Sequence, residues 1–590
     1  MSRDIELQQQ FEDDSFDDDE LVVINDELTN GNVSSGNSLS NSSKIPDVIV
    51  KFINLWHKAF LTNNSYLLYG CYSNNLNKVF DKFYKNTSYP SPIEIAPIVN
   101  NDQIFIILYS ECYYRHIYAK LSPSLEVRTS SFNNYCNLFN LILNNPSGPV
   151  SFELPNKWLW DIVDEFIYQF NQFQVYKSKL LNKSNHSQDE ILELEYLQDN
   201  QEVWSTYSVL NALYSLVGRS NMVDQLKLMR LGKNISKEIS GEYGSLPLYK
   251  NLGYFSIIGL LRIHTILGDY TLALKTIEHI ELNKKAFFTK IPGCHFTTYY
   301  YVGFCFMMMN RYQDAIKSFQ HILLYISRTK NLYNKMGNSY DIITKKSEQM
   351  FALLTICISL CPTRLDDILH QQLKEKFGDQ LQKITRPENK DLILDTFEEL
   401  FKFGAPRFID SNISLTNKFD HSISNNLNFD PLLKHWKIFK LSILKNLNTP
   451  NLKFYLNLYS SLELTKLLKL MDLRSEQELN ELLLSFKLNN RQLKLQSLQN
   501  YEQKSQQLDQ QQLQDSSSSN LSHEDEYTAS LLNGTFKTIY DIDIKVDGDH
   551  VNVLNFKSSR KYGDWFIRNL YKNYGVIDYI NNLDSTKTEK

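Results

Sequence analysis

Three carboxylates follow one another at helical spacing in the N-terminal third of the sequence. Asp161, Asp164 and Glu165 occupy positions i, i+3 and i+4, so a helix would place them on one side. Carboxylates grouped in this way can bind a metal ion or act as a general acid and base. No neighbouring histidine or nucleophile motif supports such chemistry. The pattern therefore favours a solvated or partner-facing polar face.

The other residues that could carry chemistry are isolated. Cys357 and Cys361 lie one helical turn apart, but no histidine or second cysteine pair completes a metal set, so buried thiols are expected. Gly241–Gly244 has the spacing of a backbone-clamping loop without the basic context that such a loop needs, and it reads as a turn. His264 lies in a strongly apolar stretch and is predicted to be a core histidine. With no phosphate-binding loop, GxSxG or HExxH motif, the sequence predicts no catalytic, cofactor-binding or metal-binding residue, and therefore no enzyme.

Charge and composition restrict the class of protein further. The chain has 590 residues, of which 42% are hydrophobic and 22% charged, as in globular proteins. Residues 1–45 hold eleven acidic residues against Arg3 and Lys44, a net charge of −9, which leaves +4 for the rest of a chain whose total is −5. A net charge this close to zero over residues 46–590 argues against a dedicated nucleic-acid binder. The acidic N-terminus resembles no targeting signal, and the apolar stretch Phe255–Leu267 is too short for a membrane span of about 20 residues. We expect a cytoplasmic protein with no membrane contact.

Helical periodicity dominates most of the chain. A run after Pro155 carries apolar residues on one helix face, namely Leu159, Ile162, Val163, Phe166, Phe170 and Phe173. Within 248–328 a helix-pair pattern occurs twice, with turns before Tyr270 and Tyr312 and small residues Ala273 and Ala315 at the expected crossings. This spacing predicts tetratricopeptide-like hairpins stacked into a superhelix, which is a binding architecture.

The C-terminal third changes character. Helices are expected at about 451–460 and 462–470, and a third begins at the capping residue Ser475. Alternating apolar residues on both sides of Asp547-Gly548 then predict a two-stranded wing, which gives the order of a winged-helix module. A final helix carries an apolar stripe. We expect the wing and this stripe to bind partner subunits through Tyr540, Ile542, Ile544, Phe566, Leu570, Tyr574 and Ile577.

The predicted fold class is therefore mainly α: a tetratricopeptide-like helical superhelix, then a winged-helix module, then a C-terminal helix. The predicted domains are a disordered acidic tail (1–45), an N-terminal helical region (46–230), helical repeats (231–430), a winged-helix part (431–559) with a disordered Gln/Ser-rich insert (496–526), and a C-terminal helix and tail (560–590).

A helical superhelix that ends in a winged helix resembles the PCI family, whose module would cover about 312–559. Ordered strings make the resemblance more specific, and the sequence is similar to the family of L subunits of eukaryotic translation initiation factor 3. The strings include YRHIYAK (Tyr114–Lys120), LPNKWLWDIVDEFIYQF (Leu154–Phe170), TTYYYVGF (Thr297–Phe304), RYQDAI (Arg311–Ile316) and YGDWFIR (Tyr562–Arg568). The Asn/Gln-rich style and the insert suggest a fungal version.

The resemblance implies a non-catalytic scaffold subunit. Its complex would bind the small ribosomal subunit and promote recruitment of initiator methionyl-tRNA and mRNA. The K subunit is the expected direct partner, and the E subunit a further one. Two alternatives stay open: a PCI subunit of the proteasome lid or signalosome, and a winged-helix RNA-binding protein. The acidic residues of Ser475–Leu488 weaken the second alternative, but Arg491 and Lys494 leave room for a peripheral RNA contact.

Overall fold

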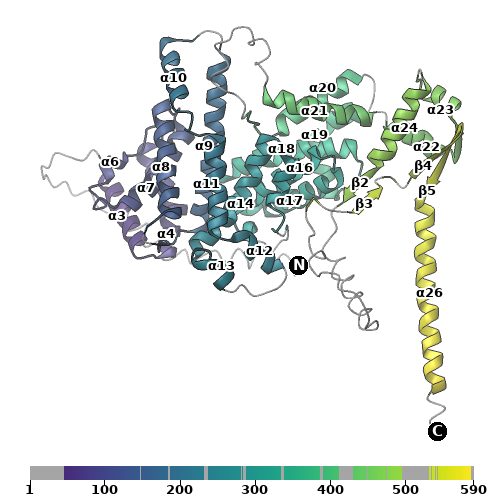
Figure 1. The fold of residues 1–590 in the computed structure, drawn as a ribbon, viewed down its shortest axis with the longest axis horizontal. Helices are drawn as coiled ribbons and strands as arrows, with labels where there is room; N and C mark the ends of the chain where they lie inside the picture. The colour runs from purple at the N-terminus through teal and green to yellow at the C-terminus, as the bar shows by residue number, and fades with distance from the viewer. Residues whose placement is uncertain are drawn as a thin grey trace. The chain divides into compact units, whose positions relative to one another are not determined.

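A computed structural model describes residues 45–585, with gaps at 147, 184–185, 231–236, 281, 283–286, 334–337, 386–389, 411–429, 448, 474, 495–530, 533–534, 539 and 541. The predicted acidic tail, apart from residue 45, and the predicted insert lie outside the described residues. The mainly helical class is confirmed, and a small three-stranded antiparallel sheet lies near the C-terminus (Figure 1). In the described part of the chain, no helix combines the length and apolarity that crossing a membrane requires.

The chain forms two compact units. The first comprises residues 1–267, 279–295 and 409–428, and the second comprises 268–278, 296–408 and 429–590. The described helices of the first unit are α3 (Asp47–Leu61), α4 (Ser65–Tyr69), the π-helix η1 (Gly70–Asn75), α5 (Leu76–Tyr84), α6 (Pro92–Ile95), α7 (Gln103–Lys120), α8 (Leu125–Leu143), α9 (Asn156–Asn182), α10 (Gln188–Asp199), α11 (Thr206–Arg219), α12 (Met222–Arg230), α13 (Lys237–Gly244), α14 (Pro247–Leu267) and the 3-10 helix η2 (Phe287–Lys290).

Helix α9 confirms the apolar face read from the sequence. All six residues of that face are buried: Leu159, Ile162, Val163, Phe166, Phe170 and Phe173. Aromatic rings gather around them. Phe166 lies 4.9 Å from Phe139 of α8 and 5.4 Å from Trp204, between ring centroids. Because aromatic side chains bury large areas, this cluster accounts for much of the cohesion between α8 and α9.

The second unit consists of helices, then strands interspersed with helices, and a final helix. Its helices are α15 (Tyr270–Thr276), α16 (Pro292–Met308, in this unit from residue 296), α17 (Tyr312–Tyr333), α18 (Asn338–Leu360), α19 (Asp367–Thr385), α20 (Lys390–Gly404), α21 (Pro431–Leu447), α22 (Thr449–Leu458), α23 (Leu464–Leu470), α24 (Glu476–Asn490) and α26 (Phe556–Ser585). Its strands are β1 (Ser461–Glu463), β2 (Arg491–Lys494), β3 (Thr535–Thr538), β4 (Ile542–Asp547) and β5 (His550–Asn555).

Helices α16 and α17 approach each other closely. A Cβ atom placed on Gly303 would lie 2.5 Å from the ring of Phe319, so the packing requires the absence of a side chain there. Ala315 of α17 is fully buried, as is Ala273 of α15. Ala273 and Ala315 are the small residues that the sequence analysis placed at helix crossings.

A buried ion pair fixes the turn between α16 and α17. Arg311 and Asp314 are 2% and 3% exposed, and their side chains lie 2.7 Å apart. Arg311 also donates a hydrogen bond to the backbone carbonyl of Leu531, which lies just before β3. One guanidinium therefore joins the helical hairpin to the chain that enters the C-terminal strands.

In chain order, the C-terminal part of the second unit comprises α22, β1, α23, α24, β2, β3, β4 and β5. Strands β2 and β3 form a separate two-stranded antiparallel sheet. The other three strands form an antiparallel sheet in the order β1-β5-β4, and β4 and β5 are joined by a tight turn in which Gly548 has a φ of +57°. The hairpin and the Ser475 cap of α24 confirm the expectations for those residues, since the Ser475 hydroxyl accepts a hydrogen bond from the Glu478 amide.

One element of this part was not predicted. Strand β1 occupies Ser461–Glu463, where the sequence indicated the start of a helix at 462. It pairs with β5, with Leu462 opposite Val551. Leu462 is buried between exposed neighbours. Three residues are too few to show an alternating pattern above the helical background.

Candidate functional site

The three carboxylates that could have formed an acidic site all lie on α9 but do not converge. Asp164 pairs with Arg262 of α14. Asp161 accepts a hydrogen bond from the Tyr72 hydroxyl at 2.7 Å and lies 3.7 Å from Arg115. The remaining carboxylate, Glu165, accepts a hydrogen bond from the amide of Gln169 at 2.9 Å. They have different partners, so the arrangement leaves no shared position for a metal ion or a substrate.

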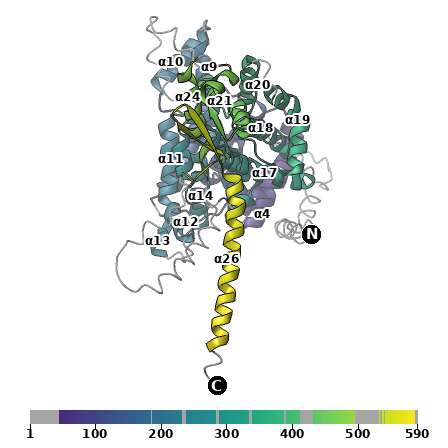
Figure 2. The same ribbon diagram turned by 90° about the vertical axis from the view of Figure 1, so that its right-hand side faces the viewer.

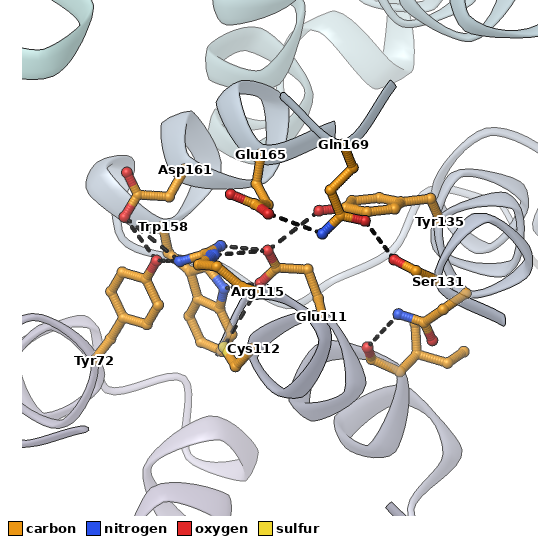
Figure 3. Close-up of polar contacts among 12 residues, drawn as sticks. Tyr72, Glu111, Cys112, Arg115, Ser131, Tyr135, Trp158, Asp161, Glu165 and Gln169 are labelled. Atoms are coloured by element: carbon orange, nitrogen blue, oxygen red, sulfur yellow. Dashed lines mark hydrogen bonds and ion pairs between the residues drawn. The ribbon is translucent and has the colours of Figure 1, made fainter. Parts of the chain in front are cut away.

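The centre of the polar cluster is a residue that the sequence analysis did not single out (Figure 3). Glu111 of α7 is completely buried and forms an ion pair with Arg115 one helical turn later. Its carboxylate also faces the hydroxyl of Tyr135, 3.4 Å away, and the indole nitrogen of Trp158, 3.5 Å away. Several donors around one carboxylate offset the cost of removing it from water. The only signal in the sequence was a glutamate followed by an arginine at i+4 in an otherwise apolar stretch.

The cluster links four helical elements, η1, α7, α8 and α9. Arg115 of α7 donates to the Tyr72 hydroxyl from η1, and the Tyr72 ring stacks on Trp158 of α9 with 4.7 Å between centroids. On the other side, Tyr135 of α8 reaches Glu111. Each element thus contributes a side chain to one hydrogen-bonded group, as Figure 3 shows. Such a group positions helices relative to one another.

The titration behaviour of the cluster is that of a structural site. Burial raises the pKa of the Glu165 carboxyl to about 7, against an opposing effect of Arg115. It also raises the pKa of the Asp161 carboxyl. The Cys112 thiol has a pKa well above its usual range because it is buried beside Glu111, so it stays protonated at neutral pH. A nucleophilic cysteine needs the thiolate form. Among the residues that the structure describes, no group of three or more His, Cys, Asp or Glu side chains could hold a metal ion.

The strand residues predicted at a partner interface lie mostly in the chain's own core. Ile542 and Ile544 of β4 are 4% and 3% exposed and pack with residues of α22, α23 and α24. Tyr540 is half-buried, and its ring stacks on Phe486 of α24 with 6.0 Å between centroids. Their inward orientation follows from the alternation of a strand that covers a helical layer. These side chains are therefore not surface contacts of the isolated chain.

The free edge of β4 is partly occupied. β4 pairs only with β5 in the described sheet, so its other edge would offer unpaired backbone groups to a neighbouring strand. The carbonyl of Ile542 accepts a hydrogen bond from the side chain of Asn490 at 2.7 Å, and that of Ile544 accepts one from Lys487 at 2.9 Å. The Ile544 amide donates to the Asp543 carboxylate. Side chains at the end of α24 and within β4 thus cover most of the edge that strand addition would need.

The four residues predicted on the final helix have the opposite environment. Helix α26 follows β5 directly (Figure 1). Phe566 is 62% exposed, Leu570 53%, Tyr574 58% and Ile577 50%. At 100° per residue they lie on one face, and exposed Ile580 extends the row. Contiguous large apolar side chains exposed to water are typical of interaction surfaces.

Comparison with known proteins connects these features to a family. A family model described as "RNA polymerase I-associated factor PAF67" matches residues 127–573. The chain is 42% identical over 550 residues to eukaryotic translation initiation factor 3 subunit L of Yarrowia lipolytica, with 93% of this chain and 92% of the relative covered. It is 39% identical to the subunit L proteins of Nematostella vectensis, over 542 residues with coverages of 92% and 94%, and of Homo sapiens, over 550 residues with coverages of 90% and 89%. The chain belongs to the family of eukaryotic translation initiation factor 3 subunit L.

Proposed function

We propose that the chain is a scaffold that joins other subunits of translation initiation factor 3 through its C-terminal helix α26. Membership of the family makes it a non-catalytic subunit of that factor. The single observation that carries the proposed role of α26 is its exposed row of Phe566, Leu570, Tyr574 and Ile577. Each such residue, once buried against a partner, contributes roughly 1.5–3 kcal/mol.

The complex and the neighbouring subunits proposed for the chain are those that membership of the family implies. Within the cytoplasm, the complex would bind the small ribosomal subunit and promote recruitment of initiator methionyl-tRNA and mRNA. The K subunit is the proposed direct neighbour, and the E subunit a second one. Helices with exposed apolar rows associate into bundles, so helices from those subunits are the partners that α26 fits. The similarity to fungal and animal relatives is nearly equal, and the proposed fungal origin rests on the Asn/Gln-rich style and the insert.

We also propose the domain scheme read from the sequence: helical regions at 46–230 and 231–430, a winged helix at 431–559 and a C-terminal helix from 560. The packing of helices α22, α23 and α24 against the three-stranded sheet β1-β5-β4 supports the winged helix. The buried Ala273 and Ala315 support tetratricopeptide-like packing in the repeat region.

A nucleic-acid role for the winged helix is the weaker candidate. Helix α24, in the position of a recognition helix, carries Glu476, Glu478 and Glu481, and these acidic residues are exposed. A helix that enters a phosphate-lined groove needs the opposite charge. Arg491 lies 3.8 Å from Asp543, and this ion pair reduces its availability for RNA. A peripheral RNA contact there remains a proposal for Arg491 and Lys494 only.

The test is a double substitution, Phe566→Asp with Leu570→Asp, in tagged full-length chain expressed with the other factor subunits. A matched control is Arg568→Gln with Lys572→Gln, which changes the net charge by the same −2 on the opposite face of α26. We expect the first variant to lose co-purification by at least tenfold, with an unchanged circular dichroism spectrum, and the control to retain it. Equal recovery of both variants would remove α26 from the interface.

A further inference from the structure

Helices α8 and α11 of the first unit lie side by side (Figure 1), and a groove of about 610 Å³ runs between them. The rings of Phe139 from α8 and Phe166 from α9, 4.9 Å apart between centroids, contribute to its apolar lining. The groove stays open because the side of α11 that faces it carries short residues, namely Ser208, Ala212, Ser215 and Gly218.

Hydrogen bonds at both ends of the groove tie α8 to α11. Trp204, just before α11, donates its indole N–H to the carbonyl of Arg128 in the first turn of α8, at 3.0 Å. Arg219, the last residue of α11, donates to the carbonyl of Leu143, the last residue of α8, at 3.1 Å. The two helices are therefore parallel, and the walls of the groove are positioned before anything binds. A preformed site loses less conformational freedom on binding.

Uncharged polar groups form much of the remaining lining. Asn140 and Asn144 of α8 and Asn211 of α11 line the groove and are exposed. The Asn144 amide donates to the Asn140 side-chain oxygen at 3.2 Å, which leaves further donor and acceptor capacity on both carboxamides. Among the described residues that line the groove, none is Asp, Glu or Lys, and the single arginine, Arg219, already donates to the Leu143 carbonyl.

This lining discriminates between classes of ligand. A phosphate backbone needs several cations, which the groove does not supply. A helix satisfies its own N–H and C=O groups, so the carboxamides would gain no main-chain partner from it. An extended chain offers both groups to carboxamides and points alternate side chains at the phenylalanine rings. The α8 wall from Phe132 to Asn144 rises about 18 Å, which about five extended residues span.

We propose that the groove between α8 and α11 binds an extended, uncharged peptide segment of another protein. The main chain of this segment hydrogen-bonds to Asn140, Asn144 and Asn211. One of its large apolar side chains packs against Phe139 and Phe166. Charged side chains are disfavoured, because the lining offers them no counter-charge and burial of an unpaired charge is costly. The site lies within the first unit, so the inference is independent of the proposed role of α26.

Phage display of random short peptides on the full-length chain tests the proposal without a known partner. Gly218→Trp serves for counter-selection, because a Cβ atom there meets no neighbouring heavy atom within 4 Å and the indole would fill the groove. We expect enriched peptides to lack Asp, Glu, Lys and Arg and to share a large apolar residue. Fluorescence anisotropy should show their affinity reduced about tenfold or more by Gly218→Trp, since the apolar contact is blocked. Gly378→Trp, at an equally open position of α19, should bind as the wild type does.

The asparagines test the main-chain contacts independently of Gly218. Asn140→Ala and Asn211→Ala should each weaken binding about two- to tenfold, the effect of one lost hydrogen bond. Asn137→Ala, at an exposed residue of α8 outside the lining, should leave binding unchanged. Methylation of main-chain nitrogens in an enriched peptide should weaken binding at one or more positions, because it removes the donors that the carboxamides accept.

Three results would overturn the proposal. One is that no peptide is enriched on the wild-type chain relative to Gly218→Trp. Another is that the enriched peptides are helical when bound and tolerate methylation at every main-chain nitrogen, which would identify a helix-binding groove. The last is that a single-stranded RNA oligonucleotide binds the wild-type chain and displaces the peptides but does not bind Gly218→Trp, which would identify a nucleic-acid site.

Discussion

Replacing Glu111 with alanine removes the centre of the polar cluster in the first unit. The carboxylate is fully buried, and its loss leaves Arg115 with Tyr72 and with Asp161 at 3.7 Å. Breaking a buried ion pair costs about 3–5 kcal/mol. Arg115 keeps a side-chain exposure of 23% and can recover some hydration, so we place the effect near the lower end, at about 3 kcal/mol. That corresponds to an opening equilibrium on the order of 100-fold more favourable.

Native-state hydrogen exchange of the full-length chain measures the opening equilibrium of individual helices. It suits a chain of two units better than a global unfolding curve, which assumes a single transition. We expect amides of α7 and α9 to exchange on the order of 100-fold faster in Glu111→Ala. Glu111→Gln, which keeps one acceptor oxygen, should have an intermediate effect. The control is Asp224→Ala, which removes a surface pair with Lys227 and should cost less than about 1 kcal/mol. If Glu111→Ala and Asp224→Ala accelerate exchange equally, the cluster does not hold these helices together.

Three further predictions concern titration, packing and the insert. The Glu165 pKa of about 7 lies above the ordinary 4.5, so the stability from this half-buried carboxyl is present below pH 4.5 and is lost as pH rises through 7. Glu165→Gln should reduce the fall in the free energy of unfolding between pH 5 and 8 by at most about 3 kcal/mol, and an unchanged fall would contradict the assignment. Ala315→Trp should destabilise the chain by about 1–3 kcal/mol or more, because Ala315 is fully buried and leaves no room for a larger side chain. Lys317→Trp, on the exposed side of α17, should have little effect. Equal melting temperatures for the two variants would refute the close packing around Ala315. Replacing residues 496–526 with a short Gly/Ser linker should change the melting temperature and the recovery of the complex little, since each doubling of loop length costs only about 0.6 kcal/mol. A large drop in melting temperature or in recovery would show that the insert folds or binds.

The sequence predicted those elements whose signals are long and local. The apolar face of α9 repeats over fifteen residues, and every member is buried. The β4–β5 hairpin was readable because alternating residues flank an Asp-Gly turn, and that turn requires the positive φ observed at Gly548. In both places, local propensity and tertiary packing agree.

What the sequence missed depends on contacts between distant residues. Strand β1 has only three residues, and it exists because β5 offers a pairing edge more than 80 residues later. Glu111 acquires its role from Tyr135 and Trp158 on other helices. Ile542 and Ile544 were grouped with the α26 residues because both sets are apolar. Only the three-dimensional arrangement shows that helices cover the strand residues, while the α26 side chains are exposed.

The central claim is that this chain works as a subunit of translation initiation factor 3. Its most direct test is native mass spectrometry of tagged full-length chain purified from its own cells at physiological salt. The account predicts the other factor subunits in near-stoichiometric amounts, with K and E among them. Recovery of the chain alone, or with proteasome-lid or signalosome subunits, would contradict it.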